Sequence, residues 1–504
     1  MIATLRQLAP MTLPMSALML AMPVQAQSVR MGEVTQWQPY GAPTAFERLE
    51  DIPGRNAVAV DARAKAGEPW ASGAGIAVPF ALRAGERITA TFWARSDRAA
   101  RVPATIQGGP PDHAGLASSS MDVGPAWRRF AIAGVAPRAL AAGSQSLTVQ
   151  LGRVPTRVQL GPVAFLKGRD GATVVDRAFA AYRPARIAED VRIRSEPGVV
   201  LAGTLKVPAT GAAHPVVLLL GGGGPAPRGI FPLLEQRLLA RGIATLSYDK
   251  RGVGQSTGTL LDTNEVMIRD ATAAIAWLRE RPDLDPRRVA LFGLSQGAVI
   301  APAIAAGDPA IATIALLAAP AGRQGVLFLD AMCVQLARGG HAQEAVARIL
   351  AAVRPFMEAR AATASEADLT PLRNALTGAI ETSGRSAIEA AAWTHMLADP
   401  VVVSQWKVGA SAVLAQVRAP VLALYAEDDA IVFPSLAAKE ARLALSGNPD
   451  AAVAVMPGMN HGFQRLGTGP NGKPAHAGPP VSDPATLDRV TDWLSSHLKT
   501  AVGR

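Results

Sequence analysis

Two patterns of apolar and polar residues divide the chain. Between residues 35 and 167, apolar and polar positions alternate over short runs that Gly, Pro and Asp separate. In the run 86–95, Ile88 and Phe92 fall on one face of a strand and Trp93 on the other, because successive side chains point to opposite sides. This pattern predicts an antiparallel β-sandwich domain, with Trp93 either facing solvent or covered by the neighbouring domain.

From residue 188 the pattern changes to strand-like apolar runs that alternate with helical stretches. The alternation predicts an α/β domain over residues 188–500, with a mostly parallel sheet covered by helices. Residues 168–187 are expected to be a connector between the two domains. The strand-like runs are 199–207, 215–220, 243–248, 288–292, 311–317, 420–425 and 451–455.

One interval interrupts the alternation of strands and helices. Residues 325 to about 412 are rich in Ala, show helical periodicity at 331–336 and 345–353, and contain little strand signal. We expect a helical cap inserted between two strands, where it would act as a lid.

The first residues have the form of an export signal. Arg6 is the only charge before an apolar run, and residues 24–26 place small side chains where a signal peptidase reads. Prolines break the run, which is shorter than the roughly 20 residues of a spanning helix. Residues 1–26 therefore predict a signal peptide and a periplasmic or secreted protein without a membrane span. Cys333 is the only cysteine, so no internal disulfide forms.

Composition excludes some function classes. With 504 residues, 49% of them apolar and 18% charged, the chain can bury a core large enough for an enzyme. The formal net charge is +10, but Lys and Arg are scattered rather than clustered. The charge therefore predicts a solvated surface and no nucleic-acid partner.

Two pentapeptides have the form Gly-x-Ser-x-Gly, one around Ser295 and one around Ser256. A serine hydroxyl becomes a useful nucleophile when a sharp strand-to-helix turn holds it near a base. Ser295 follows an apolar strand and precedes an apolar helix, whereas Ser256 lies inside a loop where no helix begins. Ser295 is the predicted nucleophile, and Ser256 is expected to be structural.

The base and the acid are expected later in the chain, in the order serine, acid, histidine. His461 follows the strand-like run 451–455, whereas His476 lies in a Gly- and Pro-rich loop and His497 in a terminal helix. His461 is therefore the predicted base. A cluster of acids, 427–429, follows the run 420–425, and one of them is expected to orient the histidine.

Backbone amides are expected to bind the oxyanion. Gly221–Gly224 follow a buried strand, and Gln296 follows the nucleophile, so the amides of Gly223 and Gln296 are the predicted donors. The glycine run is not followed by the Lys-Ser or Lys-Thr pair of a phosphate-binding loop, which argues against a nucleotide site.

The segments GGGGP, YDKRGVGQSTG, GLSQG, AEDDAIV and NHGFQ, in this order, resemble bacterial α/β-hydrolases of the dienelactone-hydrolase-like and prolyl-oligopeptidase-like serine esterases. The resemblance runs from about 190 to 500 and implies ester hydrolysis through an acyl-enzyme, without metal or cofactor. It also implies Asp429 as the acid, three residues before Val432. The sequence departs from the family at Gly221, where a bracing side chain is usual, and at Ala426, where the acid loop usually has glycine.

Function is therefore expected to be hydrolysis of a small-molecule carboxylic ester by Ser295, His461 and Asp429. A peptidase, acyltransferase or thioesterase with the same triad is an alternative. Parts of the N-terminal domain resemble jelly-roll carbohydrate-binding modules, so a glycan-binding protein without catalysis is a second alternative. In that case Trp93 would stack on a sugar ring.

Overall fold

A computed structural model describes residues 28–63, 67–108, 115–168, 171–183, 186–209, 211, 213–468, 474–476 and 478–500. The predicted signal peptide, residues 1–26, lies outside the described residues. Within them, every helix falls short of the length or apolar character that crossing a bilayer requires.

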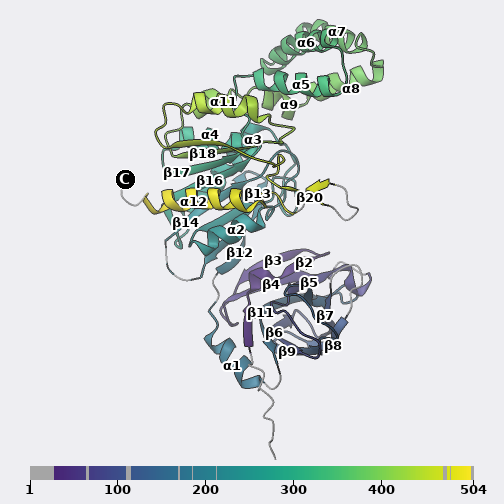
Figure 1. The fold of residues 1–504 in the computed structure, drawn as a ribbon, viewed down its shortest axis with the longest axis vertical. Helices are drawn as coiled ribbons and strands as arrows, with labels where there is room; N and C mark the ends of the chain where they lie inside the picture. Colours follow the sequence, from purple (N-terminus) through teal and green to yellow (C-terminus); the bar gives the residue numbers. More distant parts are fainter. Residues whose placement is uncertain are drawn as a thin grey trace, which may run out of the picture.

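Two antiparallel sheets form the N-terminal domain, the lower half of the molecule in Figure 1. Apolar side chains of both sheets, such as Phe92 and Leu147, are fully buried in one shared core. The first sheet has the order β3 (Thr44–Arg48), β4 (Asn56–Asp61), β11 (Arg157–Lys167), β6 (Arg87–Ser96) and β9 (Arg128–Val135), with β1 (Ser28–Gly32) also paired to β11. The second has the order β2 (Gln38–Tyr40), β5 (Gly73–Ala77), β10 (Gln145–Gln150), β7 (Ala100–Gly108) and β8 (Gly115–Val123).

Helix α1 (Ala172–Ala181) occupies the segment for which the sequence predicted only a connector. Its buried Val175 and Phe179 are four residues apart, so they share one helical face, which packs against the sandwich. Trp93 lies opposite the core residue Phe92, as the alternation predicts, but it is half-buried and meets Phe179 edge-on at 6.3 Å between ring centroids. Trp93 is therefore covered by α1 of its own domain, and not by the second domain as the covered alternative expected.

An eight-stranded sheet forms the second domain. Numbered in sequence order within this domain, its strands lie in the order 1-2-4-3-5-6-7-8. Strand 2 is antiparallel to both of its neighbours, strands 1 and 4. Strands 4, 3, 5, 6, 7 and 8 run parallel to one another. With helices on both faces, this is the architecture of the α/β-hydrolase fold. The strands in sheet order are β12 (Arg186–Glu196), β13 (Val199–Pro208), β15 (Ala244–Tyr248), β14 (His214–Leu220), β16 (Leu284–Leu294), β17 (Ile311–Leu317), β18 (Val421–Ala426) and β19 (Ala451–Met456).

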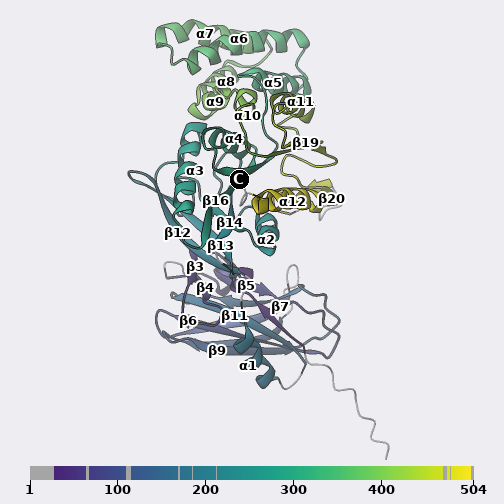
Figure 2. The same cartoon turned by 90° about the vertical axis from the view of Figure 1, so that its left-hand side faces the viewer.

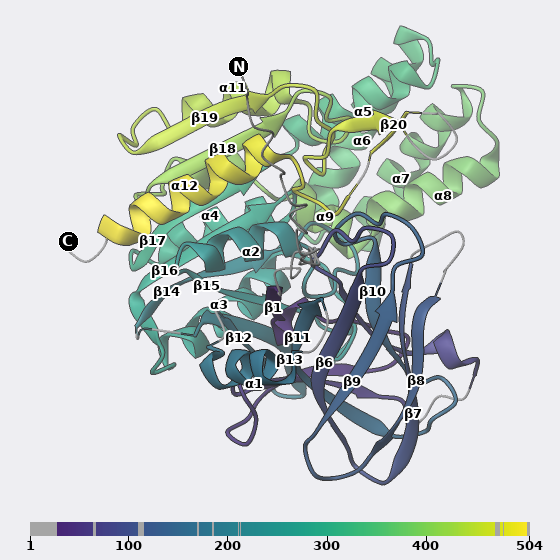
Figure 3. The same cartoon turned by 60° about the horizontal axis from the view of Figure 1, so that its bottom comes forward.

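Helices cover both faces of this sheet. Helices α2 (Pro232–Ala240) and α12 (Pro484–Thr500) lie side by side, as Figures 1 and 3 show, and Arg241 pairs with Asp492 between them. Helices α3 (Asn264–Arg279) and α4 (Gly297–Gly307) cover the opposite face (Figure 2). Helix α11 (Pro434–Ala444) follows β18, and the short strands β20 (Leu466–Thr468) and β21 (Pro474–His476) precede α12.

Six helices fill the interval between β17 and β18, where the sequence predicts a helical insertion. They have a core of their own, which includes Phe356 and Trp406, and they stand above the sheet in Figures 1 and 2. We call them the cap. The helices are α5 (Val326–Arg338), α6 (Gln343–Ala361), α7 (Glu366–Glu381), α8 (Ala387–Ala398), α9 (Pro400–Trp406) and α10 (Ala410–Leu414).

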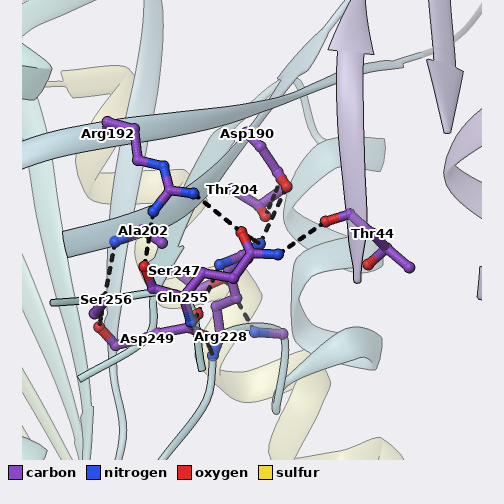
Figure 4. A network of polar contacts seen from close by, with 11 residues as sticks. Thr44, Asp190, Arg192, Ala202, Thr204, Arg228, Ser247, Asp249, Gln255 and Ser256 are labelled. Atoms are coloured by element: carbon purple, nitrogen blue, oxygen red, sulfur yellow. Dashed lines mark hydrogen bonds and ion pairs between the residues drawn. The ribbon is translucent and has the colours of Figure 1, made fainter. Parts of the chain in front are cut away.

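Polar contacts join the two domains. The Asn56 side chain donates to Ala188 O at 2.7 Å and accepts from Ala188 N at 3.2 Å. A side chain of β4 in the sandwich is thus hydrogen-bonded to the backbone of β12 in the second domain. Gln255, in the loop after β15, donates from Nε2 to Thr44 O at 3.2 Å (Figure 4). The β-sandwich is thereby hydrogen-bonded to a loop at the carboxyl end of a parallel strand, β15.

Candidate active site

Ser295 stands at the sharp turn between β16 and α4. Its φ is +57°, in the left-handed region that non-glycine residues seldom occupy. The two flanking glycines permit this turn, since a Cβ on Gly293 would lie 2.2 Å from Gly297 O and one on Gly297 would lie 2.3 Å from Leu220 O. The backbone therefore lifts the Ser295 hydroxyl out of the sheet edge, as a nucleophile elbow does.

Asp429 and His461 are hydrogen-bonded to each other. His461 Nδ1 lies 2.8 Å from Asp429 Oδ2. The other carboxylate oxygen accepts from the backbone amides of Ile431 and Val432 at 2.8 and 2.9 Å, so the nearly buried carboxylate has a fixed orientation. This contact leaves His461 Nε2 as the ring nitrogen that can exchange a proton with a substrate or nucleophile. The described residues include no hydrogen bond between Ser295 Oγ and His461.

The competing residues lie elsewhere. Asp428 is exposed, and its backbone amide donates to Met459 O at 2.9 Å. His476 ends β21, and His497 packs against Trp493 within α12. Ser256 Oγ donates to Asp249 O at 2.6 Å and accepts from Ala202 N at 2.9 Å, which fixes the loop after β15 (Figure 4).

The two predicted oxyanion donors lie beside the elbow. A Cβ on Gly222 would lie 3.4 Å from Ser295 Cβ, and Gly223 lines the same cavity as Ser295. Within the described part of the chain, neither the Gly223 amide nor the Gln296 amide has a hydrogen-bond acceptor. Both amides are thus free to bind an oxyanion.

A buried ion pair, which no motif in the sequence predicts, lies next to Gly222 and Gln296. Lys250 Nζ is 2.6 Å from Asp262 Oδ1, with the two side chains 3% and 6% exposed. Burial lowers the pKa of Lys250, and its hydrogen bond to Asp262 opposes that shift. Lys250 also donates to Gly222 O at 2.6 Å and to Gln296 Oε1 at 3.2 Å, so it contacts both sides of the oxyanion site.

A cavity of about 430 Å³ opens above Ser295. Its wall is mainly apolar, and α5, α8 and α9 of the cap supply much of it through residues such as Phe328, Met396 and Val402. Among the described residues that line it, Arg323 carries the only charge, and none has a carboxylate. The cavity therefore suits an uncharged or anionic group attached to the reacting carbonyl.

Across the described ranges, no three His, Cys, Asp or Glu side chains are placed to hold a metal ion.

Curated relatives match only part of the chain. Protein Rv2307c of Mycobacterium tuberculosis, described as uncharacterized, is 32% identical over 125 residues, which cover 25% of this chain and 43% of that protein. The quorum-quenching protein AidA of Acinetobacter baumannii is 34% identical over 110 residues, 21% of this chain and 36% of that protein. The chain thus spans about two fifths of the length of these relatives.

Solved structures align over a larger share of the chain. The alpha/beta hydrolase GrgF from a Penicillium species aligns with 62% of this chain and 99% of its own, at 19% identity and a TM-score of 0.37. Acetyl xylan esterase 1 from a Thermoanaerobacterium species aligns with 63% of this chain and 86% of its own, at 15% identity and a TM-score of 0.39.

The family match covers more of the chain than the matches to these two relatives do. Residues 176–438, just over half of the chain, match the X-Pro dipeptidyl-peptidase (S15) family. This stretch includes the elbow, Gly221–Gly224, the cap and Asp429. The chain therefore belongs to the X-Pro dipeptidyl-peptidase (S15) family of serine hydrolases.

Proposed function

We propose that this hydrolase cleaves carboxylic esters through an acyl-enzyme on Ser295. The observation that carries the proposal is the elbow serine at the base of an apolar cavity whose described lining has no carboxylate. The narrower resemblance to dienelactone-hydrolase-like and prolyl-oligopeptidase-like esterases agrees with this proposal.

In the proposed mechanism, Ser295 Oγ attacks the ester carbonyl carbon while its proton passes to His461 Nε2. The amides of Gly223 and Gln296 bind the oxyanion of the tetrahedral intermediate. His461 then protonates the leaving alkoxide as its C–O bond breaks. In the second half, His461 removes a proton from water as the water oxygen attacks the acyl carbon. His461 then returns this proton to Ser295 Oγ as the bond between Oγ and the acyl carbon breaks, which releases the carboxylic acid.

Asp429 acts through His461 in this scheme. The short contact to Nδ1 holds the imidazole in the tautomer that has its lone pair on Nε2, and it stabilises the imidazolium that forms during attack.

Peptide hydrolysis is the second candidate, because the family match favours it. A dipeptidyl-peptidase must accept a substrate with a free α-ammonium group, and removing that charge from water without a partner is costly. The only charge among the described lining residues belongs to the cation Arg323, which would repel an ammonium group. The lining therefore favours the ester proposal.

Two matched esters test this choice. The p-nitrophenyl esters of heptanoate and ω-aminohexanoate have equal length and differ in a terminal methyl or ammonium group. The proposal predicts a higher kcat/KM for heptanoate and little turnover of glycyl-prolyl p-nitroanilide. Preference for the ammonium ester together with rapid anilide cleavage would establish the peptidase instead. Ser295→Ala should abolish whichever activity is found.

Export and glycan binding are separate proposals. We propose a periplasmic or secreted location on the sequence of residues 1–26 alone.

For the β-sandwich we propose a structural role, because Arg129 lies over the Trp93 ring at 5.8 Å and Phe179 meets that ring edge-on. Retention on polysaccharide that disappears in Trp93→Ala would instead support a glycan site.

A further inference from the structure

The loop that carries the Gly223 amide has no side chains of its own to hold it. Residues Gly221–Gly224 are four consecutive glycines, each free to adopt backbone conformations that other residues avoid. A loop of this kind can rotate its peptide planes at little steric cost. An oxyanion donor must nevertheless point in a fixed direction before the reaction begins, because preorganised dipoles are what lower the barrier.

Lys250 fixes one of these peptide planes. The Gly222 carbonyl and the Gly223 N–H belong to the same planar trans peptide, so they point in opposite directions. Lys250 Nζ donates to this carbonyl at 2.6 Å. Holding the oxygen toward Lys250 therefore holds the Gly223 N–H away from Lys250. Gly222 itself lies against Ser295.

Asp262 fixes the next peptide plane. Its Oδ2 accepts from Gly224 N at 2.5 Å, and its Oδ1 accepts from Lys250. The planes on both sides of the Gly223 Cα are thus held by one buried ion pair. Rotation of either plane would remove a hydrogen bond from a buried charged group, which is costly.

The same two residues hold the side chain of Gln296, whose backbone amide is the second predicted donor. Gln296 Oε1 accepts from Lys250 at 3.2 Å, and Gln296 Nε2 donates to Asp262 O at 2.7 Å. Asn264 Oδ1 lies 3.3 Å from that Nε2, and the Asn264 amide donates to Ser404 Oγ of α9 at 2.7 Å. The network therefore runs from the oxyanion loop through the residue after the nucleophile to the cap.

We infer that Lys250 and Asp262 are positioning residues that set the direction of the Gly223 amide and hold the Gln296 side chain, in place of the side chain that is absent at Gly221. The inference rests on the proposed use of the Gly223 and Gln296 amides as oxyanion donors. It concerns the orientation of those amides, and it holds for esters, amides or thioesters alike.

Lys250→Met tests the inference, since Met keeps the length and apolar stem of Lys and removes its donors. The measurement is the rate at which a fluorophosphonate labels Ser295, beside kcat and KM for p-nitrophenyl butanoate. Both reactions place negative charge on an oxygen in the oxyanion site. We expect the labelling rate and kcat to fall by roughly 10- to 100-fold with KM little changed. The reason is that a misdirected Gly223 amide stabilises the oxyanion less than a correctly directed one.

A double variant separates positioning from stability. Lys250→Met alone leaves the Asp262 charge buried and unpaired, and this lowers the melting temperature. Adding Asp262→Asn removes that charge, so the double variant should regain much of the lost stability. The Gly222 carbonyl still lacks its donor, so labelling and kcat should stay low. Recovery of both rates along with the melting temperature would overturn the inference.

Lys206→Met is the matched control. Lys206 of β13 pairs with the buried Glu235 of α2, and among the described residues neither side chain is hydrogen-bonded to Gly221–Gly224, Ser295 or Gln296. It should lower stability without a comparable loss of labelling rate. Equal labelling losses in the Lys206 and Lys250 variants would also contradict the inference. A wild-type protein that labels at Ser295 but hydrolyses no ester would reject the ester proposal alone, because the labelling rates would still report on Lys250.

Discussion

His461 Nδ1 lies 2.8 Å from Asp429 Oδ2, whereas the adjacent Asp428 points to solvent. The choice between the two acids follows from the backbone after β18. The Ile431 and Val432 amides hold the Asp429 carboxylate within the protein, while Asp428 is held only through its own backbone amide.

Asp429→Asn should therefore lower kcat by about 10⁴, the loss seen when an amide favours the wrong tautomer of a catalytic histidine. Asp428→Asn should change kcat less than about twofold, because an exposed carboxylate contributes little. Steady-state kinetics of both variants on one ester decide the matter, and the reverse ranking would make Asp428 the acid.

Ser256→Ala should lower stability without lowering kcat. Its hydroxyl makes two hydrogen bonds that join the loop after β15 to β13. Their loss should reduce the free energy of unfolding by about 1–3 kcal/mol, since the Ala202 amide is left without its acceptor. Urea denaturation measures the change. A loss of kcat as large as that of Ser295→Ala would mean that Ser256 takes part in the reaction.

Met332→Trp should shorten the acyl chains that the enzyme accepts. Met332 of α5 lines the cavity above Ser295, so a larger side chain there reduces the space left for substrate. We expect kcat/KM to fall for octanoate esters and to change little for acetate esters. Ile388→Trp is the control, because Ile388 of α8 is 83% exposed. Unchanged chain-length preference in Met332→Trp would show that the cap does not form the acyl wall.

Asn56→Ala tests the contact between the domains. The substitution removes the two hydrogen bonds that Asn56 makes to the buried amide and carbonyl of Ala188. Their loss should lower the free energy of unfolding by about 1–3 kcal/mol. kcat should not change, since Asn56 touches no predicted site residue. Every predicted catalytic residue lies after residue 188, so a deletion of residues 27–167 removes none of them. The contacts of Asn56 and of Thr44 with Gln255 now predict that such a deletion lowers the melting temperature.

The predictable part of the site is the part encoded locally. Ser295 stands between an apolar strand and an apolar helix, and His461 and Asp429 directly follow strand-like runs. Parallel strands bring such positions to one edge of a sheet, so sequence order was enough to group them. The alternation around Phe92 likewise assigned Trp93 to the face opposite the core.

The missed parts depend on contacts between distant segments. Lys250 and Asp262 lie in loops whose sequence gives no sign that they meet behind a glycine loop, and the absence of a side chain at Gly221 suggested that no brace existed. Helix α1 did leave a signal, since Val175 and Phe179 are spaced by one helical turn. That signal covered too few residues to stand out between two domains.

Covalent labelling of the wild-type protein tests the central claim most directly. The protein is treated with a fluorophosphonate, digested, and the modified peptide identified by mass spectrometry, while ester turnover is followed in the same sample. The account predicts one phosphonylated site at Ser295, loss of turnover in proportion to labelling, and no label in Ser295→Ala. An adduct on another residue such as Ser256, or full ester turnover by Ser295→Ala, would contradict it.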